Sequence, residues 1–454
     1  MTQKVKLKVV EKEDTKKIDD EDSNGFRYDL LSIKPINWLA RRRWYPHAII
    51  AVNFVVFMLV IAAGFFGTTV GNANISIILV WIVWWSALIM FLVPVMGRYW
   101  CTICPIPMLG EWFQRGQPIS KTPGKSKLRG LNKRWPKKFR NMWPATLGFL
   151  TVAIFSGLLT TIPLATAIML SLLIIVAVIT SYVFQKRTFC RYLCPIGGFI
   201  GLYSQSAPLE LRVKDPDVCA CHRPKDCVIG NDLGFACPWM EYPGKMDKNT
   251  YCGLCMECFK VCPQDNIALN VRPFGADLVK PAGKMDEAFK ANVMLGAAML
   301  YSVVLLGPYG DFKALANFDT ILGAIKYGAF FFAVLLGVIP AYFYSFAWIN
   351  SKVVTSKNIS PKEIFKNFAY TTVPLGLMTW IGFSLLVIIS NWVYIVNVIN
   401  DPFGWGWQLL GIDSLKWNPV ITGIIPYLII AIIMIGFWWS IKLVSSISRE
   451  LFPV

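Results

Sequence analysis

The amino-acid sequence predicts a mainly α-helical, polytopic membrane protein of about eight spans, interrupted by a cysteine-rich insert that lies outside the membrane. Three observations lead to this prediction. Hydrophobic residues make up 55% of the 454-residue chain and occur in long runs without charge. Basic residues fall in alternate segments between those runs. All twelve cysteines lie between positions 101 and 262.

The first four spans are predicted from two charge-free runs. Residues 48–97 and residues 145–184 contain no Asp, Glu, Lys or Arg. A helix rises about 1.5 Å per residue and the core of a bilayer is about 30 Å thick, so each run is long enough for two crossings. Gly67–Asn74 offers a turn in the first run, and Thr160–Ala165 offers a proline-containing break in the second.

Four further spans are predicted after the cysteine-rich insert. They cover about Ala291–Gly310, Thr320–Ile349, Phe368–Val398 and Pro419–Ile441. Prolines within these spans are tolerated in a bilayer, because neighbouring helices satisfy the backbone groups that proline frees. The sequence therefore predicts four spans on each side of the insert.

The basic residues indicate how these spans are oriented. Of the 45 Lys and Arg residues, 42 lie in residues 1–45, 96–142, 186–290, 351–367 and 442–454. Basic loops stay on the cytoplasmic side, so these alternate segments are expected to share that side. We therefore expect a multi-pass protein of the cell membrane, surrounded by lipid, with both termini and the insert in the cytoplasm. Topology accounts for the net charge of +18, and nucleic acid is not expected as a partner.

The regular cysteine motif of the insert is that of a bacterial ferredoxin. Residues 252–262 are Cys-x2-Cys-x2-Cys-x3-Cys followed by proline, the spacing that holds a [4Fe–4S] cluster. An irregular counterpart, residues 219–237, has four more cysteines and also ends in Cys-Pro. In two-cluster ferredoxins the last cysteine of each motif ligates the other cluster. This rule predicts two [4Fe–4S] clusters, one held by Cys252, Cys255, Cys258 and Cys237 and the other by Cys219, Cys221, Cys227 and Cys262.

Two other interpretations of these eight cysteines stay open. A structural zinc site would also use four thiolates, and the irregular motif fits it better than the regular one. Disulfide bonds would pair the thiols, but reducing conditions in the cytoplasm disfavour them.

Two further cysteine pairs follow the second and fourth predicted spans. Residues 97–112 are GRYWCTICPIPMLGEW and residues 186–201 are KRTFCRYLCPIGGFIG, which suggests an internal repeat of a helical hairpin and a Cys-Pro loop. Proline keeps a helix from continuing, so each loop can bend and present its thiols. Beside Arg98 and Arg191 we expect one iron–sulfur or metal centre, with two separate thiol pairs as the alternative. Its ligands would be Cys101, Cys104, Cys190 and Cys194.

Together these motifs resemble the NapH/NosR/CcoG-type membrane polyferredoxins, which pair two membrane Cys-Pro motifs with a following two-cluster ferredoxin segment. The resemblance covers roughly residues 45–275. The usual family spacing is Cys-x3-Cys-Pro, which Cys190 and Cys194 match, whereas Cys101 and Cys104 are one residue closer. NapH-like members have four spans before the ferredoxin segment, as predicted here. The resemblance implies a membrane iron–sulfur protein and does not extend beyond Ala291.

The chain is therefore predicted to have four parts. They are a basic cytoplasmic tail (1–45), a four-helix membrane half with two Cys-Pro motifs (46–200), a ferredoxin-like segment with two clusters (201–285) and a four-helix half without cofactor ligands (286–454). His47 and His222 are the only histidines, so a haem with two histidine ligands is not expected. No Walker A or GxGxxG motif indicates nucleotide chemistry.

These features favour one-electron transfer. We expect an electron-transfer subunit of an oxidoreductase complex that relays electrons between a quinone or quinol in the membrane and a redox protein partner. Arg223 and Lys260 are expected to form a basic docking surface for that partner. No catalytic residue is assigned. The alternative function is that of an enzyme in the manner of CcoG, a cupric reductase that binds copper at the juxtamembrane thiolates.

Overall fold

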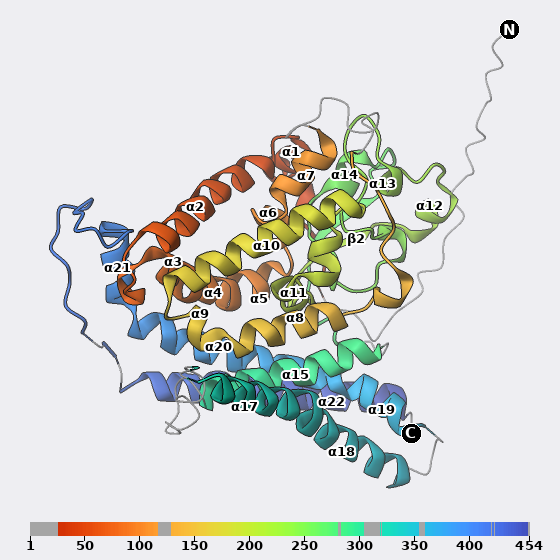
Figure 1. Cartoon of the computed structure of the whole chain (residues 1–454). Coiled ribbons are helices and arrows are strands. Elements are labelled where there is room, and N and C mark those ends of the chain that lie inside the picture. Colours follow the sequence, from red (N-terminus) through yellow and green to blue (C-terminus); the bar gives the residue numbers. More distant parts are fainter. Residues whose placement is uncertain are drawn as a thin grey trace.

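The chain folds into a bundle of apolar helices beside a smaller unit that carries the ferredoxin-like segment (Figure 1). The computed structural model describes residues 26–116, 129–279, 283–303, 318, 320–353, 359–418, 420–421 and 423–452. Within these residues, six helical stretches are long and apolar enough to cross a membrane. They are α2 (His47–Phe66), Ile75–Met96, α10 (Pro163–Val183), Ile321–Val353, Pro361–Ser390 and α22 (Ile425–Leu451).

The predicted number of eight spans is not confirmed, because two of the expected crossings are shorter helices. These are α8 (Trp143–Ile154), which α9 (Ser156–Leu159) extends, and α15 (Met285–Tyr301). α15 begins before the predicted run and carries Glu287 and Lys290 as buried groups. The rest of that predicted span, from residue 304 on, lies outside the described residues.

The second crossing contains two π-helical turns, which occur often at functional sites. Its parts are α3 (Ile75–Ile77), η3 (Ile78–Trp84), α4 (Trp85–Ala87), η4 (Leu88–Leu92) and α5 (Val93–Met96). Two consecutive tryptophans at the end of the first π-helical turn face different neighbours. The ring of Trp84 lies 5.5 Å from that of Trp100, and the ring of Trp85 lies 5.4 Å from that of Phe199.

The second half of the chain consists of interrupted helices. They are α17 (Ile321–Phe332), η11 (Ala333–Val338), α18 (Ile339–Val353), α19 (Pro361–Phe368), η12 (Ala369–Thr371), α20 (Thr372–Ser390) and α21 (Trp392–Asn400). The predicted span to Val398 ends at Ser390, because the chain leaves the helix at Asn391 before α21 begins.

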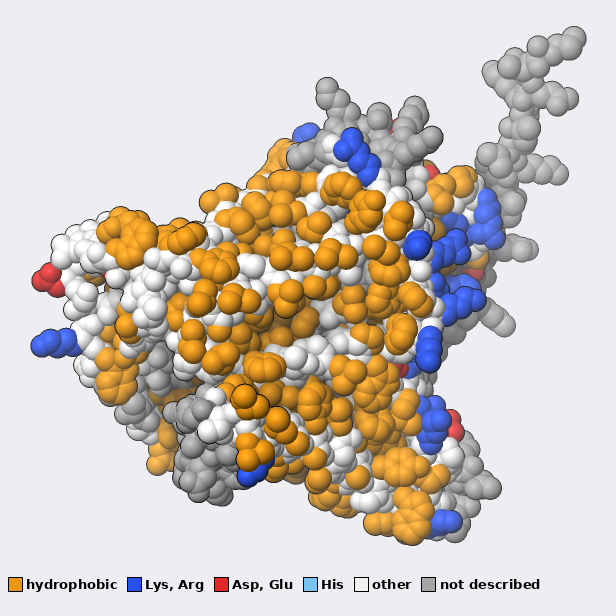
Figure 2. Space-filling model, viewed as in Figure 1, with side chains coloured by type: hydrophobic (Ala, Val, Ile, Leu, Met, Phe, Trp, Pro, Cys, Tyr) orange, Lys and Arg blue, Asp and Glu red, His pale blue; other side chains and the backbone are white. Residues whose placement is uncertain are grey.

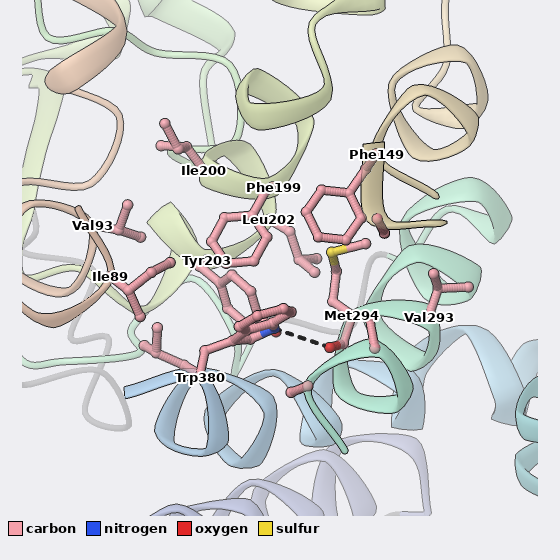
Figure 3. Packing of buried hydrophobic residues seen from close by; sticks show 14 of the residues in the cluster. Ile89, Val93, Phe149, Phe199, Ile200, Leu202, Tyr203, Val293, Met294 and Trp380 are labelled. Carbon is pink, nitrogen blue, oxygen red and sulfur yellow. Dashed lines mark hydrogen bonds between the residues drawn. The ribbon is translucent and has the colours of Figure 1, made fainter. Parts of the chain in front are cut away.

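Both halves share one core (Figure 3). Trp380 of α20 packs edge-on against Trp85 and Phe199, with 5.6 Å between ring centroids in each pair. Its indole N–H donates a hydrogen bond to the carbonyl of Met294 in α15 at 3.1 Å. Phe149 of α8 also meets Trp380 edge-on. The second half therefore packs directly against the half that carries the juxtamembrane cysteines.

A small antiparallel sheet organises the extramembrane unit. Its strands lie in the order β1 (Tyr28–Asp29), β3 (Ile267–Val271) and β2 (Leu209–Val213). Leu211 pairs with Leu269, and both side chains are buried in a core with Phe259. β1 is followed by η1 (Leu30–Ser32) and α1 (Lys34–Arg41). Residues 28–41, which the sequence placed in the basic tail, are thus part of this folded unit.

Short helices carry four of the eight cysteines of this unit, Cys219, Cys221, Cys227 and Cys258. These helices are α12 (Pro216–Cys221), α13 (Asp226–Ile229) and α14 (Glu257–Val261). On the face drawn in Figure 2, hydrophobic side chains cover the middle of the molecule, and most visible Lys and Arg side chains gather at the end that carries this unit. That distribution agrees with the basic segments predicted to lie on one side.

Candidate functional site

Both juxtamembrane cysteine pairs lie beside the extramembrane unit. α5 leads through Gly97, which has a φ of 58°, into α6 (Trp100–Ile103) with the first pair. η7 (Phe189–Leu193) follows α10 and carries the second pair. The hydroxyl of Thr102 in α6 donates to the carbonyl of Gly253, inside the ferredoxin-like motif.

The proline after each pair ends the local helix. Cys104 has an extended backbone before Pro105, and α7 (Met108–Arg115) begins after that turn. Cys194 is also extended, and Pro195 is the first residue of α11 (Pro195–Tyr203). The Gly197 N–H donates to the Cys194 sulfur at 3.3 Å. Both loops therefore bend where the sequence predicts.

Two buried arginines hold the two cysteine loops together by a reciprocal exchange. Arg98 stands three residues before Cys101 and donates to the backbone carbonyl of Cys190 at 2.7 Å. Arg187 stands three residues before Cys190 and donates to the backbone carbonyl of Cys101 at 2.5 Å. Arg98 also donates to the Thr250 carbonyl at 2.7 Å. Each arginine thus fixes the loop of the opposite motif, and Arg98 also bonds to the ferredoxin-like segment.

Only one of these two arginines has an acidic partner among the described residues. Glu111 of α7 makes two contacts with the Arg187 guanidinium, one of them at 3.1 Å. Although burial alone would raise the pKa of Glu111, the charges of Arg187 and Arg115 lower it to about 2. The pair is therefore ionised at neutral pH. Arg98 instead faces Trp239, with its guanidinium carbon 4.5 Å from the ring centroid.

The four juxtamembrane thiols are close enough to affect one another's ionisation. Burial and the charge of Cys101 together raise the pKa of Cys194 to about 11. Burial also raises the pKa of Cys104, with contributions from Cys101 and Cys194. The pKa of Cys190 is raised by burial and by the charges of the other three. The structure thus places these four residues near one another, and the shared centre that the sequence suggests stays a prediction.

All four of these thiols line one apolar cavity of about 320 Å³. Its other walls come from the residues around the cysteines, including α11, and from α2, η3, α8 and α10, among them Phe57, Leu79, Val152 and Leu173. The cavity therefore extends from the cysteine loops toward the membrane-spanning helices. Trp84 also lines it, and its buried indole nitrogen has no hydrogen-bond partner among the described residues.

Cys237 lies with the first three cysteines of the regular motif. Burial and the charge of Cys237 together raise the pKa of Cys252 to about 12. Burial likewise raises the pKa values of Cys255 and Cys258, again with a contribution from Cys237. These are the four residues that the crossed rule assigns to one cluster. Cys237 and Cys255 also pack against the core shared by the membrane helices.

Three of the other four cysteines also lie together. Burial raises the pKa of Cys227 to about 11, with contributions from Cys219, Cys237 and Cys262. Asn266 donates hydrogen bonds to two sulfurs, from its side chain to Cys219 at 3.3 Å and from its backbone to Cys262 at 3.4 Å. Cys221 is exposed on α12, so this group reaches the surface of the extramembrane unit.

Trp239 lies between the juxtamembrane cysteines and the ferredoxin-like cysteines. It follows Cys237-Pro238 and is almost fully buried. Its ring faces Arg98 and Arg187, and it packs so closely on Gly253 that residue 253 has no room for a Cβ. Burial lowers the pKa of Arg187, whereas the charges of Glu111, Cys190 and Cys255 raise it. Cys255 is therefore near the juxtamembrane loops.

The residues around the cysteines fit bound iron–sulfur clusters. All twelve thiols are free of disulfide bonds. Two buried N–H donors beside the cysteine loops, Arg98 Nε and Trp239 Nε1, have no protein acceptor among the described residues. Cluster sulfurs accept such hydrogen bonds, and these bonds help to set the reduction potential. No three His, Cys, Asp or Glu side chains in the described part of the chain converge tightly enough to hold a single metal ion.

The structure also identifies site residues that the sequence did not single out. They are Arg187, Glu111 and Trp239, which contact residues far away in the sequence. The Arg-x-x-Cys pattern, which both motifs share, is the one sequence signal that points to Arg187. Arg191, expected beside the thiols, instead pairs with Glu241 at 2.5 Å. Lys260 is not a docking residue, because it is buried and bonded to the Tyr45 carbonyl and to Glu257.

Comparison with known proteins supports iron–sulfur binding at these cysteines. A family model described as a 4Fe-4S binding domain matches residues 77–128 and 166–213. Each matched stretch contains one juxtamembrane cysteine pair, and each begins within a membrane helix. The two matches agree with the internal repeat that the sequence suggests. They support a ferredoxin-type iron–sulfur protein, and the narrower resemblance to NapH/NosR/CcoG proteins stays a hypothesis.

One curated relative is also similar over a limited region. An uncharacterized protein of Methanocaldococcus jannaschii is 26% identical over 102 residues, which is 22% of this chain and 38% of that protein. The match thus spans well under half of the relative. No solved structure matches.

Proposed function

We propose that this protein is a membrane iron–sulfur electron-transfer protein that relays electrons between a quinone or quinol in the cell membrane and a redox protein on the cytoplasmic side. One observation carries the proposal: three groups of cysteines follow one another from the apolar cavity, past Trp239, to the exposed residue Cys221. Bound [4Fe–4S] clusters supply one-electron transfer. The chain supplies ligands, hydrogen-bond donors and burial.

The apolar cavity supports the choice of a quinone as the membrane partner. A lipophilic quinone would enter among membrane helices, and its ring carries carbonyl oxygens that need hydrogen-bond donors. The cavity has apolar walls and one unpartnered donor, Trp84 Nε1. Ligand sites commonly combine apolar walls with a few such polar groups. Cys101, Cys104, Cys190 and Cys194 would hold the centre nearest to this partner.

The middle of the proposed path depends on the contact between the two cysteine-bearing regions. Arg98 binds the second juxtamembrane loop and the Thr250 carbonyl at once, so it fixes their separation. Trp239 is almost fully buried and contacts both Arg98 and Gly253. Its N–H is free to donate to a cluster held by Cys252, Cys255, Cys258 and Cys237.

The surface end of the path would be the group of Cys219, Cys221, Cys227 and Cys262. Arg223 is exposed beside Cys221, and Lys225 donates to the carbonyl of Cys219. A basic surface next to the last cluster would attract an acidic redox partner. The cupric-reductase alternative is not favoured by the comparisons or by the described residues.

Anaerobic purification followed by quinol reduction tests this function. We expect about 12 iron atoms per chain, corresponding to three [4Fe–4S] clusters, and reduction of the clusters by a lipophilic quinol. Filling the cavity with Leu173→Trp should slow reduction by quinol and leave reduction by dithionite unchanged. The matched control is Ile175→Trp on the same helix, whose side chain is 53% exposed. Protein without iron, or clusters that no quinol reduces, would contradict the proposal.

A further inference from the structure

A second cavity, of about 400 Å³, lies beside the ferredoxin-like segment and takes no part in the proposed electron path. Its walls come from four parts of the chain. They are Arg134, Trp135 and Arg140 before α8, Gln185, Arg191 and Tyr192 between α10 and α11, Met240 and Tyr251 of the ferredoxin-like segment, and Lys284 before α15.

Positive charge dominates this cavity. Four basic side chains line it, and acidic side chains pair with only two of them among the described residues. Glu241 lies 2.5 Å from Arg191, and Glu287 lies 4.0 Å from Lys284. Arg134 makes no hydrogen bond or ion pair with a described residue. Like charges repel one another in an empty site, so an anion bound among them would relieve that repulsion.

The cavity also offers hydrogen-bond donors. The Nε of Arg191 is buried and has no acceptor among the described residues. Arg140 donates from Nε and Nη2 to the Trp135 carbonyl, at 3.0 and 2.9 Å. These two bonds fix one edge of its guanidinium group. Arginine guanidinium groups match the oxygen atoms of phosphate in pairs, which makes them the preferred side chains for that group.

Aromatic walls hold one of these cations, Arg191, in place. The rings of Trp135 and Tyr192 stack, with centroids 5.9 Å apart and planes inclined by 5°. The guanidinium carbon of Arg191 lies 4.5 Å from the centroid of the Tyr251 ring. A cation held over a ring loses little freedom when it binds a ligand, because its position is already fixed. The site is thus built around Arg191 before any ligand arrives.

We propose that this cavity binds a phosphate group. The group belongs either to the headgroup of an anionic phospholipid or to a free phosphate. Both sources fit, because the cavity lies at the ends of α8, α10 and α15, where lipid headgroups meet the bundle, and because basic pockets between membrane helices bind such headgroups. The proposal does not depend on electron transfer.

Binding to the full-length protein tests this inference. We would compare inorganic phosphate, phosphatidylglycerol and phosphatidylcholine as probes, using tryptophan fluorescence for phosphate and native mass spectrometry for the lipids. In the double variant Arg134→Gln/Arg140→Gln, binding of the preferred phosphate ligand should weaken by at least about tenfold, since charged hydrogen bonds are lost. The matched control is Lys137→Gln/Lys138→Gln, which changes two exposed residues of the same segment outside the cavity. Lys284→Gln should weaken binding less than the double variant.

The outcomes separate the sources and can overturn the site. Binding of phosphatidylglycerol without inorganic phosphate identifies a lipid headgroup, and binding of inorganic phosphate alone identifies a soluble ligand. Equal binding by the Arg134→Gln/Arg140→Gln and Lys137→Gln/Lys138→Gln variants, with iron content unchanged in both, refutes the site. Failure of the wild-type protein to bind either phosphate probe refutes it as well.

Discussion

The two juxtamembrane cysteine motifs are built alike, but the second has one residue more between its cysteines. In the first motif, the residues from Cys101 to Ile103 lie in the α-helical turn α6. In the second, the Cys194 N–H bonds to the carbonyl of Phe189, five residues back, in the π-helical turn η7. A π-helical turn takes about one residue more than an α-helical turn. The wider turn therefore accommodates the extra residue, and both motifs can present their thiols to one place.

The two motifs also differ in charge. Each supplies one buried arginine, but among the described residues only Arg187 has an acidic partner, Glu111. Arg98 is held by carbonyl oxygens and by the ring of Trp239. One motif therefore adds a neutral ion pair and the other adds a net positive charge. A positive charge beside the thiolates stabilises an anionic centre, so the unpaired arginine is the asymmetric element of an otherwise repeated design.

Among changes that test this comparison, removing Glu111 should have the largest effect on stability. Both motifs would then carry a buried arginine whose charge no carboxylate balances. We expect Glu111→Gln to lower the free energy of unfolding by about 3–5 kcal/mol, the cost of breaking one side of a buried ion pair. Denaturant unfolding in detergent measures it, with Glu363→Gln as the exposed control. A loss smaller than about 1 kcal/mol would show that Arg187 finds another partner.

The second largest effect on stability is expected for Arg98→Lys, which keeps the positive charge and removes the guanidinium group with its two donating arms. A lysine ammonium cannot reach the carbonyls of Thr250 and Cys190 together, so one charged hydrogen bond is lost at a cost of about 1.5–3 kcal/mol. The same unfolding measurement checks this value, with the exposed Arg42→Lys as control. Stability equal to the wild type would mean that the reciprocal exchange does not hold the loops together.

A smaller effect is expected on reduction potential from Trp239→Phe. The change removes the indole N–H and leaves an aromatic ring between Arg98 and Gly253. Losing one hydrogen bond of about 0.5–1.5 kcal/mol to a cluster should lower its reduction potential by about 20–65 mV. EPR-monitored redox titration measures the shift. A rise, or no change in any cluster, would argue against a hydrogen bond from this side chain.

The smallest effect on stability is expected from a change of pH between 8 and 5. The pKa of Glu111 is lowered from 4.5 to about 2 in the folded protein, so its stabilisation is complete above pH 4.5 and is lost only as pH falls toward 2. The stability difference between the wild type and Glu111→Gln should therefore stay constant from pH 8 to pH 5. Unfolding at several pH values measures this difference. A difference that shrinks between pH 7 and pH 5 would mean a higher pKa for Glu111.

Much of the architecture could be predicted from the sequence because it depends on local patterns. Long apolar runs predict the six helices that can cross a membrane, and cysteine spacing predicts ferredoxin-type iron–sulfur binding. The predicted third and fifth spans are not confirmed, because their helices are short in the described residues and residues 304–310 of the fifth lie outside them. α8 ends after twelve residues, and α15 contains Glu287 and Lys290, whose burial depends on neighbouring helices.

The parts of the site that could not be predicted depend on contacts between distant segments. Arg98 and Cys190 are 92 positions apart, and Arg187 and Glu111 are 76 apart. Spacing within one motif carries no information about such pairs. Lys260 illustrates the same limit, because its charge suggests a surface residue although its partners bury it.

Iron content of cysteine variants tests most directly whether the two motifs share one centre. We expect Cys104→Ser and Cys194→Ser each to lose about four of about 12 iron atoms per chain, and the double variant to lose the same four. Equal, non-additive losses follow if both residues ligate one [4Fe–4S] cluster. Unchanged iron in both single variants, or a double variant whose loss is the sum of two separate losses, would contradict a shared centre.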